Sequence, residues 1–232
     1  AFGAQFLALW RDEGVDTSGV EVDANAHTGL YFVQHGPDGH AFSYLRRGSA
    51  ASLMTPASLN GGLIERARFL HVSGVSLAIS TSACDTVFAA IARARAAGVQ
   101  VSLDSNLRLR LWPLDRARAV LREALCHADL FLPSMDDMQH LTGNDDPERT
   151  LDWIRDAGAT GVVVLKLGKD GSIIDDGKTR TPVAALRVDA VDATGAGDCF
   201  AGSLLARRCQ GDDWAAAVRY ANAAAALSTL GY

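Results

Sequence analysis

The chain has 232 residues, which suits one large α/β domain or one domain with a small lobe. Apolar residues make up 48% of it and charged residues 21%, the balance of a globular protein with a substantial core. The net charge of −5 argues against a nucleic-acid-binding surface, because phosphate backbones select basic faces. The apolar runs are too short to span a membrane, and the four cysteines form no CxxC pair, which favours reduced thiols in the cytoplasm.

The first part of the chain predicts a helix followed by a small β lid. Apolar side chains recur at helical spacing along residues 2–13. Strand-like runs at 28–34 and 41–46 flank residues 35–39, whose proline and glycines signal a hairpin turn. We expect residues 28–47 to form a lid on a single domain spanning 1–232. The exposed edges of this lid favour pairing with a second subunit, and hence a homo-oligomer.

From about residue 66, short apolar strands alternate with helices. Strands are expected at 68–72, 99–103, 130–132 and 162–167, with helices at 82–97, 115–127, 134–141 and 147–157. This alternation predicts an α/β fold with a mostly parallel sheet flanked by helices. A second hairpin is expected at 172–175 and 179–182, followed by two Ala-rich helices at 196–208 and 213–230. The chain begins without Met inside a helical pattern and ends without a closing element, so we expect pieces to be missing at both ends.

The strongest functional signal is the run DATGAGD at residues 192–198, directly before an Ala-rich helix. Gly195 and Gly197 lack Cβ, so backbone N–H groups there can approach a ligand closely. The first N–H groups of the helix have no partner within it, and such a terminus attracts phosphate. Asp198 lies in the first turn, where a carboxylate suits a general base that takes a proton from an attacking hydroxyl. The structural alternative is a glycine-rich turn with Asp198 as an acid at a helix start.

This run resembles the C-terminal signature of the ribokinase-like (PfkB) carbohydrate kinases. The resemblance implies a ribokinase-like fold with a small β lid, and Asp198 as the group that activates the substrate hydroxyl. It implies an anion hole made by Gly195, Ala196 and Gly197, and ATP with Mg²⁺ as the phosphoryl donor. A Rossmann dinucleotide site is disfavoured because its fingerprint belongs at the first strand-to-helix turn, and no Walker A sequence occurs. A requirement for a monovalent cation stays open.

Residues 166–172 resemble the K-x-G-x-x-G segment that lies along the nucleotide in this family. The match implies nucleotide contacts from Lys166, Gly168, Gly171 and Ser172. An ordinary strand–turn–strand is the alternative for this segment.

Three further positions are similar to nucleotide or metal positions of the family. Asn222 lies 24 residues after Asp198, a spacing that matches a position near the adenine, and a solvent-facing helix Asn is its alternative. Ser134 and Asp137 stand where the family carries N-x-x-E, so Ser134 is expected near the nucleotide. Asp137 is expected to organise Mg²⁺ through water. Capping of helix 134–141 is the competing role for Ser134.

The run DSNLRLRLW at residues 104–112 follows an expected strand, and ligands of parallel sheets bind at the carboxyl ends of strands. The run resembles one subgroup of the family, the 2-keto-3-deoxygluconate kinases. Their substrate carries a carboxylate, which a planar guanidinium can bind through two parallel hydrogen bonds. Arg108 is the candidate for that contact, and Asn106 is expected closer to the nucleotide. A surface ion-pair role is the alternative for Arg108.

The lid adds a second group of substrate candidates. Tyr44 and Arg46, followed by the sequence SAAS at 49–52, again resemble the ketodeoxygluconate subgroup, in which these side chains reach the sugar acid. Positions 44 and 46 of one strand point to the same face. Tyr31 is a further candidate, with plain packing in the lid as its alternative.

These observations predict phosphoryl transfer from ATP to a hydroxyl of a sugar acid, most like the conversion of 2-keto-3-deoxygluconate to its 6-phosphate. A fructokinase or ribokinase acting on a neutral sugar is one alternative. A catalytically silent sugar- or nucleotide-binding protein is another. The six histidines show no metal-ligand spacing, so no zinc site is expected.

Overall fold

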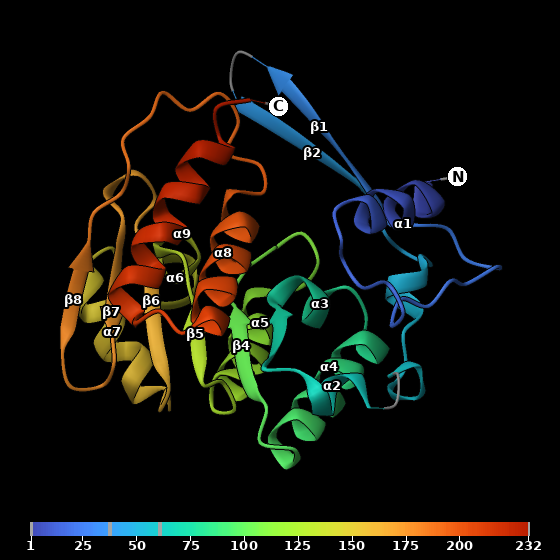
Figure 1. The fold of residues 1–232 in the computed structure, drawn as a ribbon, viewed down its shortest axis with the longest axis horizontal. Coiled ribbons are helices and arrows are strands. Elements are labelled where there is room, and N and C mark those ends of the chain that lie inside the picture. The colour runs from blue at the N-terminus through green and yellow to red at the C-terminus, as the bar shows by residue number, and fades with distance from the viewer. Residues whose placement is uncertain (1, 37–38, 60–61, 232) are drawn as a thin grey trace.

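The computed structural model describes residues 2–36, 39–59 and 62–231, which form two β-sheets and the helices around them (Figure 1). The small sheet pairs β1 (Leu30–Gly36) with β2 (Gly39–Leu45) in antiparallel register. The large sheet has six strands in the order β3-β4-β5-β6-β7-β8. Its strands are β3 (Phe69–Ser73), β4 (Gln100–Asp104), β5 (Leu130–Leu132), β6 (Val162–Lys166), β7 (Ser172–Asp175) and β8 (Arg180–Val183).

The strands β3 to β6 run parallel to one another, while β7 and β8 are antiparallel additions. The described helices are α1 (Phe2–Asp12), α2 (Leu63–Arg66), α3 (Gly74–Ala78), α4 (Thr81–Ala96), α5 (Leu114–Leu125), α6 (Met135–Thr142), α7 (Pro147–Asp156), α8 (Ala196–Gln210) and α9 (Trp214–Ser228). This mostly parallel sheet with flanking helices confirms the predicted fold class. No described helix combines the length and the apolar character that crossing a membrane requires.

Alternating side chains of the strands build one hydrophobic core on each face of the large sheet. Val101, Leu103 and Leu165 belong to the first core, which they share with buried residues of α4, α5, α6 and α7. Leu132 and Val164 belong to the second core, under α8 and α9. Figure 1 shows α8 and α9 side by side over this second face. The sheet is therefore fixed from both sides, and its carboxyl edge is left to hold polar residues.

Most expected elements match the observed ones to within about two residues, and the β5 boundaries are the expected ones. The short helices α2 and α3 were not predicted, because four or five residues are too few to show a helical period. α3 is held by tertiary contact, since a Cβ on Gly74 would lie 2.0 Å from the Ser105 carbonyl oxygen. Of the turn predicted between the lid strands, residues 37 and 38 lie outside the described residues.

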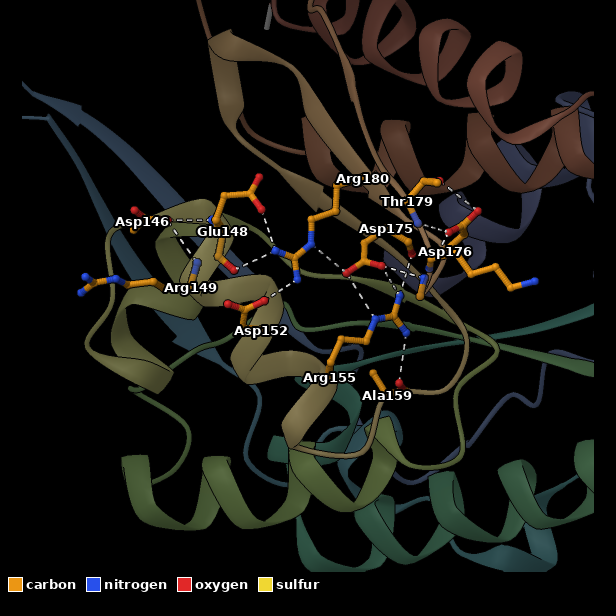
Figure 2. Close-up of polar contacts among 12 residues, drawn as sticks. Asp146, Glu148, Arg149, Asp152, Arg155, Ala159, Asp175, Asp176, Thr179 and Arg180 are labelled. Carbon is orange, nitrogen blue, oxygen red and sulfur yellow. Dashed lines mark hydrogen bonds and ion pairs between the residues drawn. The ribbon is translucent and has the colours of Figure 1, made fainter.

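A buried carboxylate, Asp175, ties the β7–β8 hairpin to α7 (Figure 2). It accepts hydrogen bonds from Arg155 of α7, with Nη2 at 2.8 Å and Nε at 3.2 Å, and lies 3.4 Å from Nε of Arg180. Arg180 also pairs with Glu148 and Asp152 on α7, each at 2.6 Å. This cluster holds the hairpin in place, and the hairpin begins with residues of the candidate site described next.

Candidate active site

The turn before α8 has the geometry of an anion site. Gly195 precedes the helix with φ of +80°, a left-handed conformation that glycine adopts without strain. It reverses the chain so that the N–H groups at the start of α8 face outward from the helix end. Asp198 lies in the first turn of α8 and is exposed. A carboxylate and the positive end of a 15-residue helix therefore lie together at this point of the surface.

A cavity of about 910 Å³ adjoins this turn. Its lining includes Ala196 and Gly197 of the predicted anion hole. It also includes six residues predicted to contact the nucleotide, namely Ser134, Lys166, Gly168, Gly171, Ser172 and Asn222. The volume suits a drug-sized or nucleotide-sized ligand. The structure therefore brings two motifs that are distant in sequence to one cavity, which ends at the start of α8.

The two glycines of the K-x-G-x-x-G segment are required, or tolerated, for different structural reasons. A Cβ on Gly171 would lie 2.2 Å from the Val183 carbonyl oxygen, and its φ is +97°, so only glycine fits between β7 and the chain beside it. Gly168 has φ of +60°, with no described atom within 4 Å of an added Cβ. Gly171 thus closes the cavity wall, while Gly168 leaves its backbone open to a ligand.

Asn222 is 8% exposed, so the solvent-facing alternative is wrong. Its Oδ1 accepts a 2.8 Å hydrogen bond from the buried Ser172 hydroxyl, and its Nδ2 donates to the carbonyl oxygens of Val183 at 3.2 Å and Ala184 at 3.3 Å. Asn222 and Ser172 therefore pin a wall of the cavity to α9. This role required the tertiary structure, because the three partners are 38 to 50 residues away in sequence.

Sequence reasoning missed the role of Asp104 at the carboxyl end of β4. The Lys166 ammonium lies 3.1 Å from both oxygens of the Asp104 carboxylate, and Asp104 is 3% exposed. Desolvation raises the pKa of Asp104, and the Lys166 charge opposes this rise. The sequence did carry a signal for this role: Asp104 ends a strand at the edge where ligands of parallel sheets bind.

His71 on β3 was likewise not singled out as a site residue. Its Nδ1 lies 3.0 Å from the Ser102 hydroxyl of the neighbouring strand. Desolvation lowers the pKa of His71, and the charges of Asp104, Lys166 and Asp198 act on it as well. The imidazole therefore shares one electrostatic environment with the carboxyl edge of the sheet and the start of α8.

Asp137 anchors the loop after β4. Its Oδ2 accepts hydrogen bonds from the Ser105 hydroxyl at 2.6 Å and from the Leu107 N–H at 3.1 Å. Asn106 lies between these donors with φ of +33°, a conformation rarely found outside glycine. Ser134 accepts a hydrogen bond from the Asp137 N–H at 3.1 Å, so it caps α6 as well as lining the cavity. Asn106 itself is not among the cavity-lining residues.

The residues present fit a Mg²⁺ ion held mainly by substrate phosphates. Both hydrogen bonds to Asp137 end on Oδ2, so Oδ1 fits the water-mediated contact that the resemblance implies. Within the described ranges no group of three or more potential ligands surrounds a metal position. Mg²⁺ commonly keeps several waters and takes only one or two carboxylates together with phosphates. The metal role of Asp137 stays a prediction.

The lid residues form a second group. Tyr31 and Tyr44 are paired across the strands with ring centroids 6.4 Å apart. The Arg46 guanidinium carbon lies 5.1 Å from the Tyr44 ring centroid and 5.7 Å from that of Tyr31. Arg46 and Tyr44 therefore share one face, as the strand alternation predicted. Arg108 is exposed on the loop after β4, where its Nη1 donates to the Leu107 carbonyl oxygen at 2.8 Å.

Comparison with known proteins identifies the class to which this fold and site belong. The family model described as pfkB family carbohydrate kinase matches residues 1–231, so the chain belongs to the pfkB family of carbohydrate kinases. The chain is therefore a sugar kinase of an ATP-utilising family, which favours catalysis over a silent binding role.

Individual relatives share this class but differ in substrate. The chain is 36% identical to the 2-dehydro-3-deoxygluconokinase of Thermoproteus tenax, over 97% of this chain and 70% of the relative. It is 35% identical to Fructokinase-1 of Oryza sativa subsp. japonica, over 98% of this chain and 73% of the relative. A solved E. coli protein described as a ribokinase II, in complex with ATP and Mg²⁺, superposes with a TM-score of 0.90 at 28% identity, over 100% of this chain and 74% of that one. The comparisons leave the sugar open.

Proposed function

We propose that the chain transfers the γ-phosphoryl group of ATP to the 6-hydroxyl of 2-keto-3-deoxygluconate. The observation that carries the choice of substrate is the position of Arg46, whose guanidinium lies over the rings of Tyr31 and Tyr44. Stacking on two rings restricts a long side chain and presents its planar N–H groups as a unit. Such a group binds a carboxylate through two parallel hydrogen bonds, and the sugar acid carries one.

In this proposal Asp198 takes the proton of the attacking hydroxyl, and the first N–H groups of α8 stabilise the charge that develops on the phosphoryl oxygens. The nucleotide occupies the cavity between Lys166 and Asn222, with the segment from Lys166 to Ser172 along it. Tyr31, Tyr44, Arg46 and Arg108 hold the sugar acid. Mg²⁺, when bound, neutralises phosphate charge. The protein supplies position and electrostatic stabilisation, as in other phosphoryl-transfer enzymes.

The second candidate is a fructokinase or ribokinase activity. The rice fructokinase favours it, because its 35% identity to this chain is within one percentage point of that of the 2-dehydro-3-deoxygluconokinase. A neutral sugar offers Arg46 and Arg108 no carboxylate. The two candidates therefore differ in what the guanidinium groups do, and arginine substitution separates them.

The test is a coupled assay of ATP consumption over a panel of sugars and sugar acids. Arg46→Ala and Arg108→Ala are expected to lower kcat/KM for 2-keto-3-deoxygluconate by about 10²-fold each, a typical effect of losing a charged hydrogen bond. Activity on fructose should change by less than about 3-fold. Arg47→Ala, at an exposed neighbouring position, is the matched control. Equal losses on both substrates would remove the sugar-acid specificity from the proposal.

The base is tested separately by Asp198→Asn. Turnover is expected to fall below detection, because the amide cannot take the hydroxyl proton. The Kd for ATP should stay within about 3-fold of the unsubstituted protein, since this change leaves the cavity lining intact. Turnover near the wild-type rate would exclude Asp198 as the base.

We also propose that the lid pairs with the lid of a second copy in a cytoplasmic homo-oligomer. Phe32 and Leu45 are 61% and 51% exposed on the two-stranded sheet, which supports a covering partner. The four free thiols support a reducing compartment. Light scattering of the wild type and of Phe32→Glu tests the assembly, with a monomeric wild type as the contrary result. Replacing potassium by choline in the kinase assay tests for a monovalent cation.

A further inference from the structure

A buried ion pair lies beside the turn that begins α8. The side chains of Lys166 and Asp104 are 14% and 5% exposed. They end strands β6 and β4, with β5 between these strands in the sheet, so the pair spans the carboxyl edge. Replacing a buried ion pair by apolar residues is often neutral or stabilising, so folding alone is a weak reason for it. Its place beside the candidate catalytic turn points to a functional reason.

The Lys166 ammonium lies next to Gly197 in the first turn of α8. A Cβ on Gly197 would lie 3.9 Å from the Lys166 Nζ. An ammonium and a helix N-terminus are both positive, and together they favour an anion between them. The ammonium has three N–H groups, and the contacts with Asp104 Oδ1 and Oδ2 account for two of them. The third is left for a ligand.

We propose that Lys166 is a further catalytic residue, whose ammonium stabilises the transferring phosphoryl group together with the N–H groups of α8. Asp104 is its positioning residue, because it holds the ammonium at the turn. The proposal deepens the proposed function and rests on it. In the reaction the sugar oxygen bonds to the γ-phosphorus as the bond to the bridging oxygen of ADP breaks, and the hydroxyl proton goes to Asp198. Lys166 keeps its protons and forms no covalent bond.

Desolvation gives this interaction its strength. A cation removed from water acts on developing negative charge more strongly than an exposed one, and Lys166 needs no reorganisation when the charge appears. Asp104 supports this arrangement, because a mostly buried ammonium without a partner is unfavourable. The pair thus fixes the ammonium where phosphate arrives.

Four variants test the proposal: Lys166→Met, Asp104→Asn, the double variant, and Lys178→Met as a control. Lys178 is an exposed lysine on the β7–β8 turn, outside the site. Lys166→Met should lower kcat by about 10²- to 10³-fold, as loss of one oxyanion donor does, and should also lower the melting temperature, because Asp104 is left buried and unpaired. The double variant removes the unpaired charge. It should regain the melting temperature but not kcat.

The double-variant cycle also tests Asp104 as a positioning residue. Asp104→Asn should lower kcat when Lys166 is present and change it by less than about 2-fold when Lys166 is methionine. The KM for the sugar should stay within about 3-fold throughout. Recovery of both stability and kcat in the double variant would overturn the proposal and leave the pair a structural one.

A binding measurement tests the role of Lys166 without relying on turnover. By calorimetry, the double variant should bind ATP at least about 10-fold more weakly than wild type, with the affinity for AMP within about 2-fold, because only ATP places a phosphate at α8. Equal weakening of both nucleotides would refute the role of Lys166. A wild-type protein inactive on every sugar would refute the proposed function instead, and the comparison of ATP with AMP would still decide the role of Lys166.

Discussion

The substitution Asp175→Asn tests how the β7–β8 hairpin is held. Asp175 is 3% exposed and accepts hydrogen bonds from Arg155, Arg180 and the Gly177 N–H. Removing one partner of a buried ion pair costs about 3–5 kcal/mol. The guanidinium of Arg155 keeps its bonds to the carbonyl oxygens of Ala159 and Gly161, so we expect the lower end, about 3 kcal/mol. For a chain of this size that corresponds to a melting temperature about 6–12 °C lower.

Urea unfolding followed by circular dichroism, with scanning calorimetry, measures this loss at pH 7. The matched control is Asp152→Asn, because Asp152 pairs with the same Arg180 at 2.6 Å but is 66% exposed. An exposed pair contributes at most about 1 kcal/mol. If Asp175→Asn lowered the free energy of unfolding no more than Asp152→Asn does, burial would not be the reason that Asp175 stabilises the β7–β8 hairpin.

The pH dependence gives an independent check on the same residue. Burial opposes the charged form of Asp175, but hydrogen bonds from Arg155 and from the Gly177 N–H outweigh it and hold its pKa below the usual value. The stabilisation is therefore present above the unfolded-state pKa of about 4 and is lost as the pH falls below it. Asp175→Asn should lack this acid-side loss. An unchanged profile between pH 5 and pH 2 would contradict the assignment.

Four further substitutions test three features of the site. In urea titrations, Gly171→Ala should lower the free energy of unfolding by about 2–4 kcal/mol, because the new Cβ would lie 2.2 Å from the Val183 carbonyl oxygen. Gly168→Ala should lower it by only about 1–2 kcal/mol, because its new Cβ meets no described atom within 4 Å. Ser134→Ala removes the cap of α6 and should cost about 1 kcal/mol by calorimetry, and no change in stability would mean that the cap is not needed. The lowered pKa of His71 favours its neutral form, so the stability that His71 contributes is present above about pH 6.5 and is lost below that value. Urea titrations at pH 5 and pH 7.5 should show this loss in the wild type but not in His71→Gln. If the loss persisted in His71→Gln, it would belong to another group.

Local features of the sequence determined the fold class and the geometry of the candidate catalytic turn. The strand at Leu130–Leu132 was predicted with its observed bounds, because a short apolar run between Asp129 and Pro133 indicates a buried strand. The candidate anion site was predicted from the DATGAGD run in the same way, since it consists of Gly195 and the start of the helix that follows directly. Capping, glycine conformation and hydrophobic period act within a few residues, so one sequence suffices to recognise them.

The tertiary structure alone decided which polar residues meet. Lys166 and Asp104 are 62 residues apart and end strands separated by β5, so no spacing rule joins them. Asn222 is buried against Ser172, which is 50 residues away in sequence, and no spacing rule predicts this contact either. Asp137 was expected to serve only a metal, and it also anchors the loop that carries Asn106. The physical reason is common to all three: the order of strands in the sheet and the packing of α9 on its edge set these distances.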